Sequence, residues 1–198
     1  TLAREGADAF YSGTIARALI SDMQERKGLI DETDLARYRV RERQPLIGSY
    51  RGHAIATAPP PSSGGVILLT ILNVLETRPV APWRDVEALH LYVEASKRAF
   101  ADRALLGDPE FFPYVRELVP ALVAKDRAQL IAQIVPQDAE PALTIPAGQG
   151  AQLPLGLHPA SKAHEGSHTS HLCVVDRDGN AVALTTTVNT SWGAAIVA

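Results

Sequence analysis

Three small polar residues near the end of the chain have the types and the spacing for acyl-transfer chemistry: Thr169, Thr187 and Asn189. Two runs rich in β-branched residues, 169–175 and 181–189, flank the sequence Asp-Arg-Asp-Gly-Asn, and this pattern predicts a β-hairpin. A turn centred on Asp178 would place Thr169 opposite Thr187, with Asn189 on the same face as Thr187. Because one residue more or less in the loop would shift the pairing, this register is a hypothesis.

The segment before the hairpin suggests how Thr169 could become a nucleophile. Residues 136–168 are rich in Pro, Gly, Ala and His with little apolar periodicity, so we expect a loose linker that leads directly to Thr169. A threonine hydroxyl attacks a carbonyl only when a base takes its proton. Cleavage before Thr169 would free its own α-amino group, whose unperturbed pKa of about 7.7–8.0 suits that task. Thr187 would hold the hydroxyl, and Asn189 would bind a polar substrate group.

Longer motifs around these residues resemble the γ-glutamyltranspeptidase family. Residues 168–171, 174–182 and 185–189 are similar to the start of that family's small subunit. Upstream motifs are similar to its large subunit, at residues 48–52, 59–65, 71–76, 94–95, 101–103 and 107–109. The resemblance covers nearly the whole chain apart from the linker.

The resemblance implies a fold and a division of the chain. The fold is α+β, the αββα sandwich of N-terminal-nucleophile hydrolases, of which this chain would hold a part. Residues 1–135 would form the C-terminal part of the large subunit, residues 136–168 a flexible linker, and residues 169–198 the start of the small subunit. We expect an internal piece of a longer precursor, inactive by itself. Three functional groups of the family have no counterpart in this sequence. They are an arginine that binds the substrate carboxylate, an acidic residue and serine pair that binds the glutamyl head, and a glycine pair that stabilises the oxyanion.

The resemblance also implies residue roles and an activity. The precursor would cleave itself between His168 and Thr169, and Thr169 would be the nucleophile. Thr187 would contact the nucleophile, and Asn189 would contact the γ-glutamyl group. The implied enzyme is a γ-glutamyl transferase or hydrolase that acts on glutathione and other γ-glutamyl amides through a γ-glutamyl-threonine ester, with water or an amino acid as acceptor. It would need no metal or organic cofactor, consist of two subunits from one precursor, and be periplasmic or secreted.

Two alternatives stay open. A cephalosporin (glutaryl) acylase shares the fold and the type of nucleophile, and the stretch after Asn189 departs from the family's glycine-rich pattern, since it reads Trp192-Gly193-Ala194-Ala195. An unprocessed, non-catalytic relative is the other alternative. A conventional Ser-His-Asp hydrolase is disfavoured, because the sequence has no Gly-x-Ser-x-Gly elbow.

Histidines near the junction raise the question of a metal site. His158, His164 and His168 lie in the loop-like linker, and only Glu165 and the distant Cys173 could complete a ligand set, so we predict no metal site. We place His171 on the same strand face as Thr169, as part of the nucleophile's surroundings.

Length and composition limit the number of domains, the classes of partner and the possible disulfides. A chain of 198 residues suits one domain with a real core. A net charge of −3 gives no reason to expect nucleic acid as a partner, and no run of 18 apolar residues is present to span a bilayer. A single cysteine, Cys173, permits no internal disulfide.

Periodicity and end signals predict the remaining elements. Helices are expected over residues 7–27, 31–38, 65–76, 83–105, 114–119 and 120–134, and strands over residues 40–50 and 53–57. Asp31 is the expected cap of the second helix, Ser62 or Ser63 that of the third, and Pro120 the first turn of the last. Pro45 indicates an edge or a bulge in the first strand. Asp102 and Arg103 are expected to pair with charges elsewhere in the fold.

Overall fold

A computed structural model describes residues 1–79, 85–151 and 169–187. The chain divides into two compact units, one made of residues 1–42 and 164–198 and the other of residues 43–163. Each unit has its own elements.

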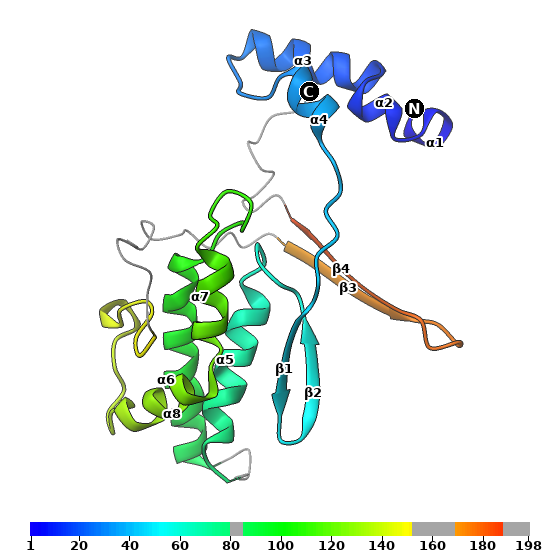
Figure 1. The fold of residues 1–198 in the computed structure, drawn as a ribbon. Coiled ribbons are helices and arrows are strands. Elements are labelled where there is room, and N and C mark those ends of the chain that lie inside the picture. Colours follow the sequence, from blue (N-terminus) through cyan, green and yellow to red (C-terminus); the bar gives the residue numbers. More distant parts are fainter. Residues whose placement is uncertain (80–84, 152–168, 188–198) are drawn as a thin grey trace. The chain divides into compact units, whose positions relative to one another are not determined.

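The unit of residues 43–163 is a group of helices beside a short hairpin (Figure 1). Strands β1 (Leu46–Tyr50) and β2 (His53–Thr57) pair antiparallel around the Arg51-Gly52 turn. The helices that follow are α5 (Gly64–Glu76), α6 (Val86–Asp102), η1 (Arg103–Leu105), α7 (Val115–Leu122), α8 (Lys125–Ile134) and η2 (Ala142–Thr144). Helix α5 packs on α6, α7, α8 and β1, so it is the centre of this unit.

Helix α5 takes part in both apolar clusters of the unit. Its N-terminal half contributes Val66 to a cluster with Leu105 and the buried side of α7, namely Val115, Leu118, Val119 and Leu122. Its C-terminal half contributes Val74 to a second cluster, with Leu91, Ala95, Ala128 and Ile131. Most of these side chains are fully buried, which accounts for the strong apolar character of the α5 sequence.

Glycine allows β1, β2 and α5 to approach each other closely. A Cβ on Gly48 would lie 2.5 Å from Leu69 Cδ2, and a Cβ on Gly65 would lie 2.2 Å from the carbonyl oxygen of Ala58. The backbone before α5 and the start of α5 therefore lie too close together for a side chain at position 65. The expected serine cap is not formed, because neither serine hydroxyl accepts an N2 or N3 amide there; Ser62 Oγ accepts the Gly64 N–H at 3.3 Å instead.

The unit of residues 1–42 and 164–198 contains short helices and a second hairpin. The helices are α1 (Leu2–Glu5), α2 (Asp8–Tyr11), α3 (Thr14–Glu25) and α4 (Glu32–Arg37), and the strands are β3 (Thr169–Val175) and β4 (Ala181–Thr187). The helix predicted over 7–27 is broken at Gly13, where a Cβ would lie 2.7 Å from Ala9 Cα. The predicted cap of α4 is confirmed as a capping box, since Asp31 Oδ1 accepts the Asp34 N–H at 2.9 Å.

Three other boundaries differ from the sequence-based expectation. Strand β1 begins only after Pro45. Pro120 lies inside α7 rather than in the first turn of α8, and α7 ends two residues later, at Leu122. Helix α6 ends at Asp102 and continues as the single 3₁₀ turn η1.

The predicted loose linker is ordered over its first half. Residues 136–151 include η2, and Ile145 is buried. Ala147 and Ala151 pack against the apolar cluster that contains the buried side of α7. Apolar periodicity could not reveal this, because the segment is held by polar contacts with α6 and α8 that are described below. The remainder of the predicted linker, residues 152–168, lies outside the described residues.

We predict that truncation of Ile131 destabilises the protein far more than truncation of its neighbour Leu130. Ile131 is 0% exposed and Leu130 is 48% exposed. Ile131→Ala should lower the free energy of unfolding by about 2–5 kcal/mol, because it removes buried methyl groups and leaves a cavity. Leu130→Ala should lower the free energy of unfolding by about 1 kcal/mol or less. Denaturant unfolding of the full-length protein measures both, and equal losses would contradict the assigned core.

Candidate functional site

The predicted hairpin and its register are both confirmed. Strands β3 and β4 pair antiparallel with Thr169 opposite Thr187, His171 opposite Thr185 and Val175 opposite Ala181. The backbones of the two threonines are therefore cross-strand neighbours at the open end of the hairpin. His168 and Asn189, the other residues of the predicted site, lie outside the described residues.

The turn of this hairpin is organised by one carboxylate. Asp176 Oδ1 accepts the backbone N–H groups of Asp178 and Asn180, each at 2.9 Å, and its Oδ2 accepts Asn180 Nδ2 at 2.8 Å. These hydrogen bonds, those from Asn180 above all, hold the pKa of Asp176 below its ordinary value. Gly179 adopts a φ of +85°, which residues with a side chain rarely adopt. The loop length, and with it the register, is fixed by these contacts.

His171 lies two residues after Thr169 and makes side-chain hydrogen bonds on both ring nitrogens. Its Nδ1 is 2.6 Å from Thr185 Oγ1 on the opposite strand, and its Nε2 is 3.1 Å from Cys173 Sγ. In either tautomer of a neutral imidazole, one ring nitrogen donates and the other accepts. Side chains alternate between the two faces of a strand, so positions 171 and 173 lie on the same face of β3 as position 169. Sequence reasoning placed His171 on this face but missed Thr185 and Cys173, although the register alone pairs positions 171 and 185.

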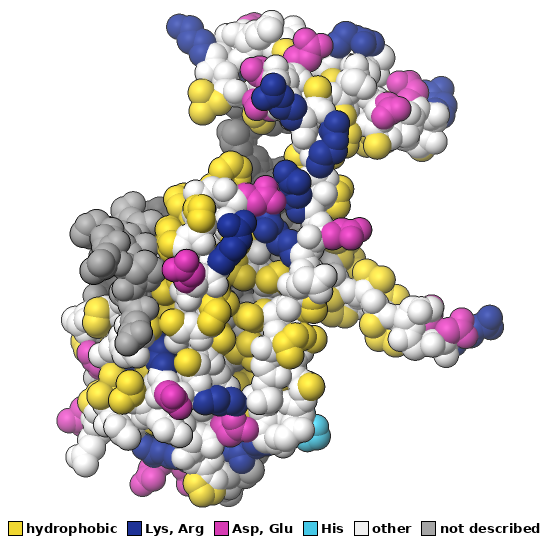
Figure 2. All heavy atoms as spheres, viewed as in Figure 1, with side chains coloured by type: hydrophobic (Ala, Val, Ile, Leu, Met, Phe, Trp, Pro, Cys, Tyr) yellow, Lys and Arg dark blue, Asp and Glu magenta, His cyan; other side chains and the backbone are white. Residues whose placement is uncertain are grey.

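The opposite face of the hairpin is apolar. It carries Leu172, Val174, Val182 and Leu184, which are 49–59% exposed. Figure 2 shows apolar side chains along the β3–β4 hairpin and charged side chains at its tip. The hairpin thus has one face with polar groups toward its open end and one face suited to packing against another layer.

The described residues contain no group of three or more His, Cys, Asp or Glu side chains arranged to hold a metal ion. His158, His164 and His168 lie outside them. In the same ranges, no helix has the length and apolar character needed to cross a bilayer.

Comparison with known families decides the assignment of the chain. The model of the family described as gamma-glutamyltranspeptidase matches residues 1–198. The chain belongs to this family.

Individual relatives and a solved structure support the same family assignment. The chain is 42% identical over 201 residues to the glutathione hydrolase proenzyme of Escherichia coli strain K12, and it is 39% identical over 199 residues to the acylase ACY 1 proenzyme of Pseudomonas sp. strain SE83. These alignments cover 100% and 98% of this chain and 32% of each relative, so the chain spans about a third of their length. The crystal structure of Helicobacter pylori gamma-glutamyltranspeptidase matches with a TM-score of 0.67 and 35% identity, over 84% of this chain and 45% of that one.

These matches confirm the predicted fold class, a partial α+β fold of the N-terminal-nucleophile hydrolase type. They also confirm the enzyme family, because the relatives are named glutathione hydrolases and gamma-glutamyltranspeptidases.

We predict that the Asp176 carboxylate, and not its neighbour Asp178, maintains the hairpin. Asp176→Ala removes the acceptor of three hydrogen bonds and should speed hydrogen exchange of the Asn180 amide, whereas Asp178→Ala removes only an exposed contact with Arg177 at 3.7 Å. Because the folded-state pKa of Asp176 is depressed, its support is present above the unfolded-state pKa and is lost as the pH falls through the folded-state pKa. Amide exchange of both full-length variants checks this, and equal protection of Asn180 in the two would refute it.

Proposed function

We propose that this chain is the central part of a γ-glutamyl transferase/hydrolase proenzyme that cleaves itself between His168 and Thr169. The observation that carries the proposal is the pairing of Thr169 with Thr187 at the open end of β3–β4. It is supported by the proenzyme and glutathione hydrolase names of relatives that match the whole chain.

The proposed maturation uses the Thr169 hydroxyl as its nucleophile. In the precursor, the Thr169 oxygen attacks the carbonyl carbon of His168, and the bond between that carbon and the Thr169 nitrogen breaks. The acyl group thus moves from nitrogen to oxygen to give an ester, and the hydroxyl proton ends on the Thr169 nitrogen. Water then hydrolyses this ester, which leaves a carboxylate on His168 and a free α-amino group on Thr169. The products are a large subunit that ends at His168 and a small subunit that begins at Thr169.

The proposed turnover begins with the freed amine. It takes the Thr169 hydroxyl proton, directly or through one water, as the oxygen attacks the γ-carbonyl of a donor such as glutathione. The same proton passes to the leaving amine, and the γ-glutamyl group remains as an ester on Thr169. Water or the amino group of an amino acid then takes the γ-glutamyl group. In this scheme Thr187 holds the nucleophile by a hydrogen bond, and Asn189 contacts the γ-glutamyl group.

The compartment we propose for this enzyme is the periplasm or the cell exterior, as the resemblance to the family implies.

A second candidate function is acylase action on a glutaryl amide. It is favoured by the 39% identity to the acylase ACY 1 proenzyme, which is close to the identity with the glutathione hydrolases. Both activities use the same nucleophile, so they differ only in the acyl group that the pocket accepts.

We predict that Thr169→Ala gives a full-length protein that stays uncut and inactive, because both steps need the hydroxyl. Thr169→Ser should retain some cleavage and some turnover. Ser170→Ala is the matched control, since position 170 lies on the opposite face of β3, and it should be processed at the wild-type rate. A denaturing gel and a γ-glutamyl anilide assay report the two steps. Normal processing of Thr169→Ala would refute self-cleavage at this position.

We predict that the processed enzyme prefers glutathione to a glutaryl amide as acyl donor, and that Asn189→Ala raises the KM for glutathione. The reason is that Asn189 is proposed to bind a polar group that belongs to the γ-glutamyl donor. Steady-state kinetics with both donors make the comparison. A higher kcat/KM for the glutaryl amide would support the acylase instead, and an unchanged KM would remove Asn189 from the site.

A further inference from the structure

A row of polar and charged side chains on α6 binds the segment that follows α8. His90, Glu94, Arg98 and Asp102 recur at intervals of four residues, so they lie along one side of the helix. Glu94, Arg98 and Asp102 are buried, with at most 1% exposure. We call residues 136–151 the anchored segment, because each of these four side chains contacts it.

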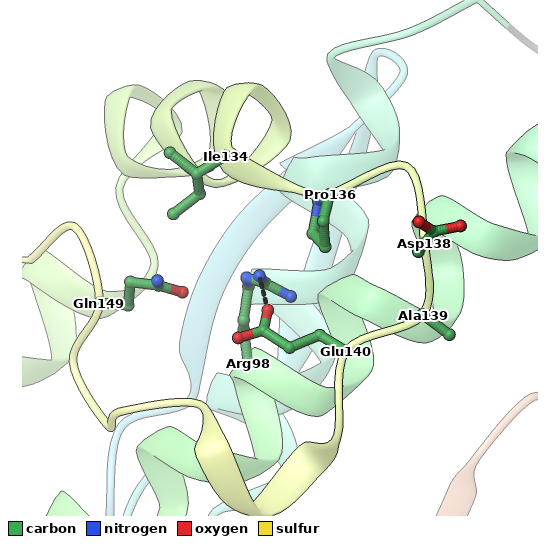
Figure 3. Close-up of a pocket in the computed structure, with 7 residues that line it drawn as sticks. All are labelled: Arg98, Ile134, Pro136, Asp138, Ala139, Glu140 and Gln149. Carbon is green, nitrogen blue, oxygen red and sulfur yellow. Dashed lines mark hydrogen bonds and ion pairs between the residues drawn. The ribbon is translucent and has the colours of Figure 1, made fainter.

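The first half of the anchored segment is held around Glu140. Arg98 lies between two carboxylates and donates to Glu94 Oε2 and to Glu140 Oε2, each at 2.8 Å. Lys97 Nζ donates to Glu94 Oε1 and to the carbonyl oxygen of Glu140, each at 2.6 Å. Figure 3 shows Arg98 and Glu140 in contact with each other in the lining of a pocket. The pocket has a volume of about 480 Å³. At the start of the anchored segment, His90 Nε2 donates to the carbonyl oxygen of Pro136 at 2.8 Å.

The second half is held by a buried pair of opposite charges. Arg127 Nη1, on α8, lies 2.8 Å from Asp102 Oδ2. Arg127 Nε donates to the carbonyl oxygen of Gln149 at 2.9 Å. Asp102 Oδ1 accepts the Gly148 N–H at 2.7 Å. Beyond these contacts, Ala151 packs on the apolar cluster of α7.

Charge and burial make these contacts depend on one another. Burial acts to raise the pKa of Glu94, but the hydrogen bonds from Lys97, Arg98 and the Glu140 N–H outweigh it and lower the pKa below its ordinary value. Burial raises the pKa of Asp102 against the opposing effect of Arg127. Hydrogen bonds between charged groups are shorter and stronger than neutral ones. Removing one partner of a buried ion pair leaves an unpaired buried charge, which strongly destabilises the folded protein. The anchored segment supplies several of those partners.

None of these contacts involves a residue after Ala151, whereas the proposed cleavage site is at His168. Cutting that bond therefore leaves in place the partners of Glu94, Arg98, Asp102 and Arg127 that are described above. We propose that the anchored segment is a permanent clamp: it stays bound to α6 and α8 through self-cleavage, so that the new C-terminal tail of the large subunit is fixed as far as Ala151. The inference rests on the proposed function for the cleavage event, but the clamp itself rests on the contacts above.

Hydrogen exchange tests the clamp in the full-length protein. The amides of Glu140 and Gly148 donate to Glu94 and Asp102, so they report directly on docking. Their protection should agree within about threefold between the uncut Thr169→Ala precursor and the processed wild-type enzyme. A loss of protection of about tenfold or more on processing would overturn the proposal, because it would show that the segment is released.

A matched pair of variants tests the clamp independently of cleavage. Glu140→Ala removes the partner of Arg98, whereas Asp138→Ala truncates another acidic side chain two positions earlier in the same segment. Glu140→Ala should speed exchange of the amides at positions 140 and 148 relative to Asp138→Ala, with amides of α5 unchanged in both. Equal exchange in the two variants would overturn the clamp. A gel of the wild-type protein shows separately whether cleavage occurs, so failure of the proposed function is distinguished from failure of the clamp.

Discussion

The proposed chemistry depends on the register of β3 with β4. Side chains alternate between the two faces of a strand, so a slip of one residue would move position 187 to the other face from position 169. The observed pairing of Thr169 with Thr187 is maintained at the far end of the hairpin by the Asp176 carboxylate and its contacts with residues 178 and 180. A turn at the tip thus determines which groups meet at the open end, where the proposed nucleophile lies.

A different constraint organises residues 43–163. Two apolar clusters account for the packing of α5 with its neighbours, but the segment toward the proposed junction is held mainly by charges. Burial of Glu94, Arg98 and Asp102 would be unfavourable without partners, and residues 136–149 provide several of them. The first half of the connection between the two proposed subunits therefore belongs to the fold of the large one.

The hairpin could be predicted from sequence because its signals are local: β-branched runs, a turn sequence and a period of two. Helices α4 and α5 were predicted closely for the same reason, whereas Gly13 and Pro120 changed helix boundaries through backbone geometry that apolar periodicity does not detect. The order of residues 136–151 was missed because it depends on long-range ion pairs such as Arg98 with Glu140. Asp102 was expected to pair with a distant charge, but its partner, Arg127, could not be named without the packing of α6 on α8. The roles of Thr169, Thr187 and Asn189 come from the family resemblance, and they remain proposals.

The central claim is that Thr169 acquires a free α-amino group and uses it to activate its own hydroxyl. N-terminal sequencing of the small subunit from active, full-length enzyme tests this most directly. The account predicts a sequence that begins Thr-Ser-His-Leu, from Thr169 onward. A fully active preparation in which the bond between residues 168 and 169 is intact would contradict it.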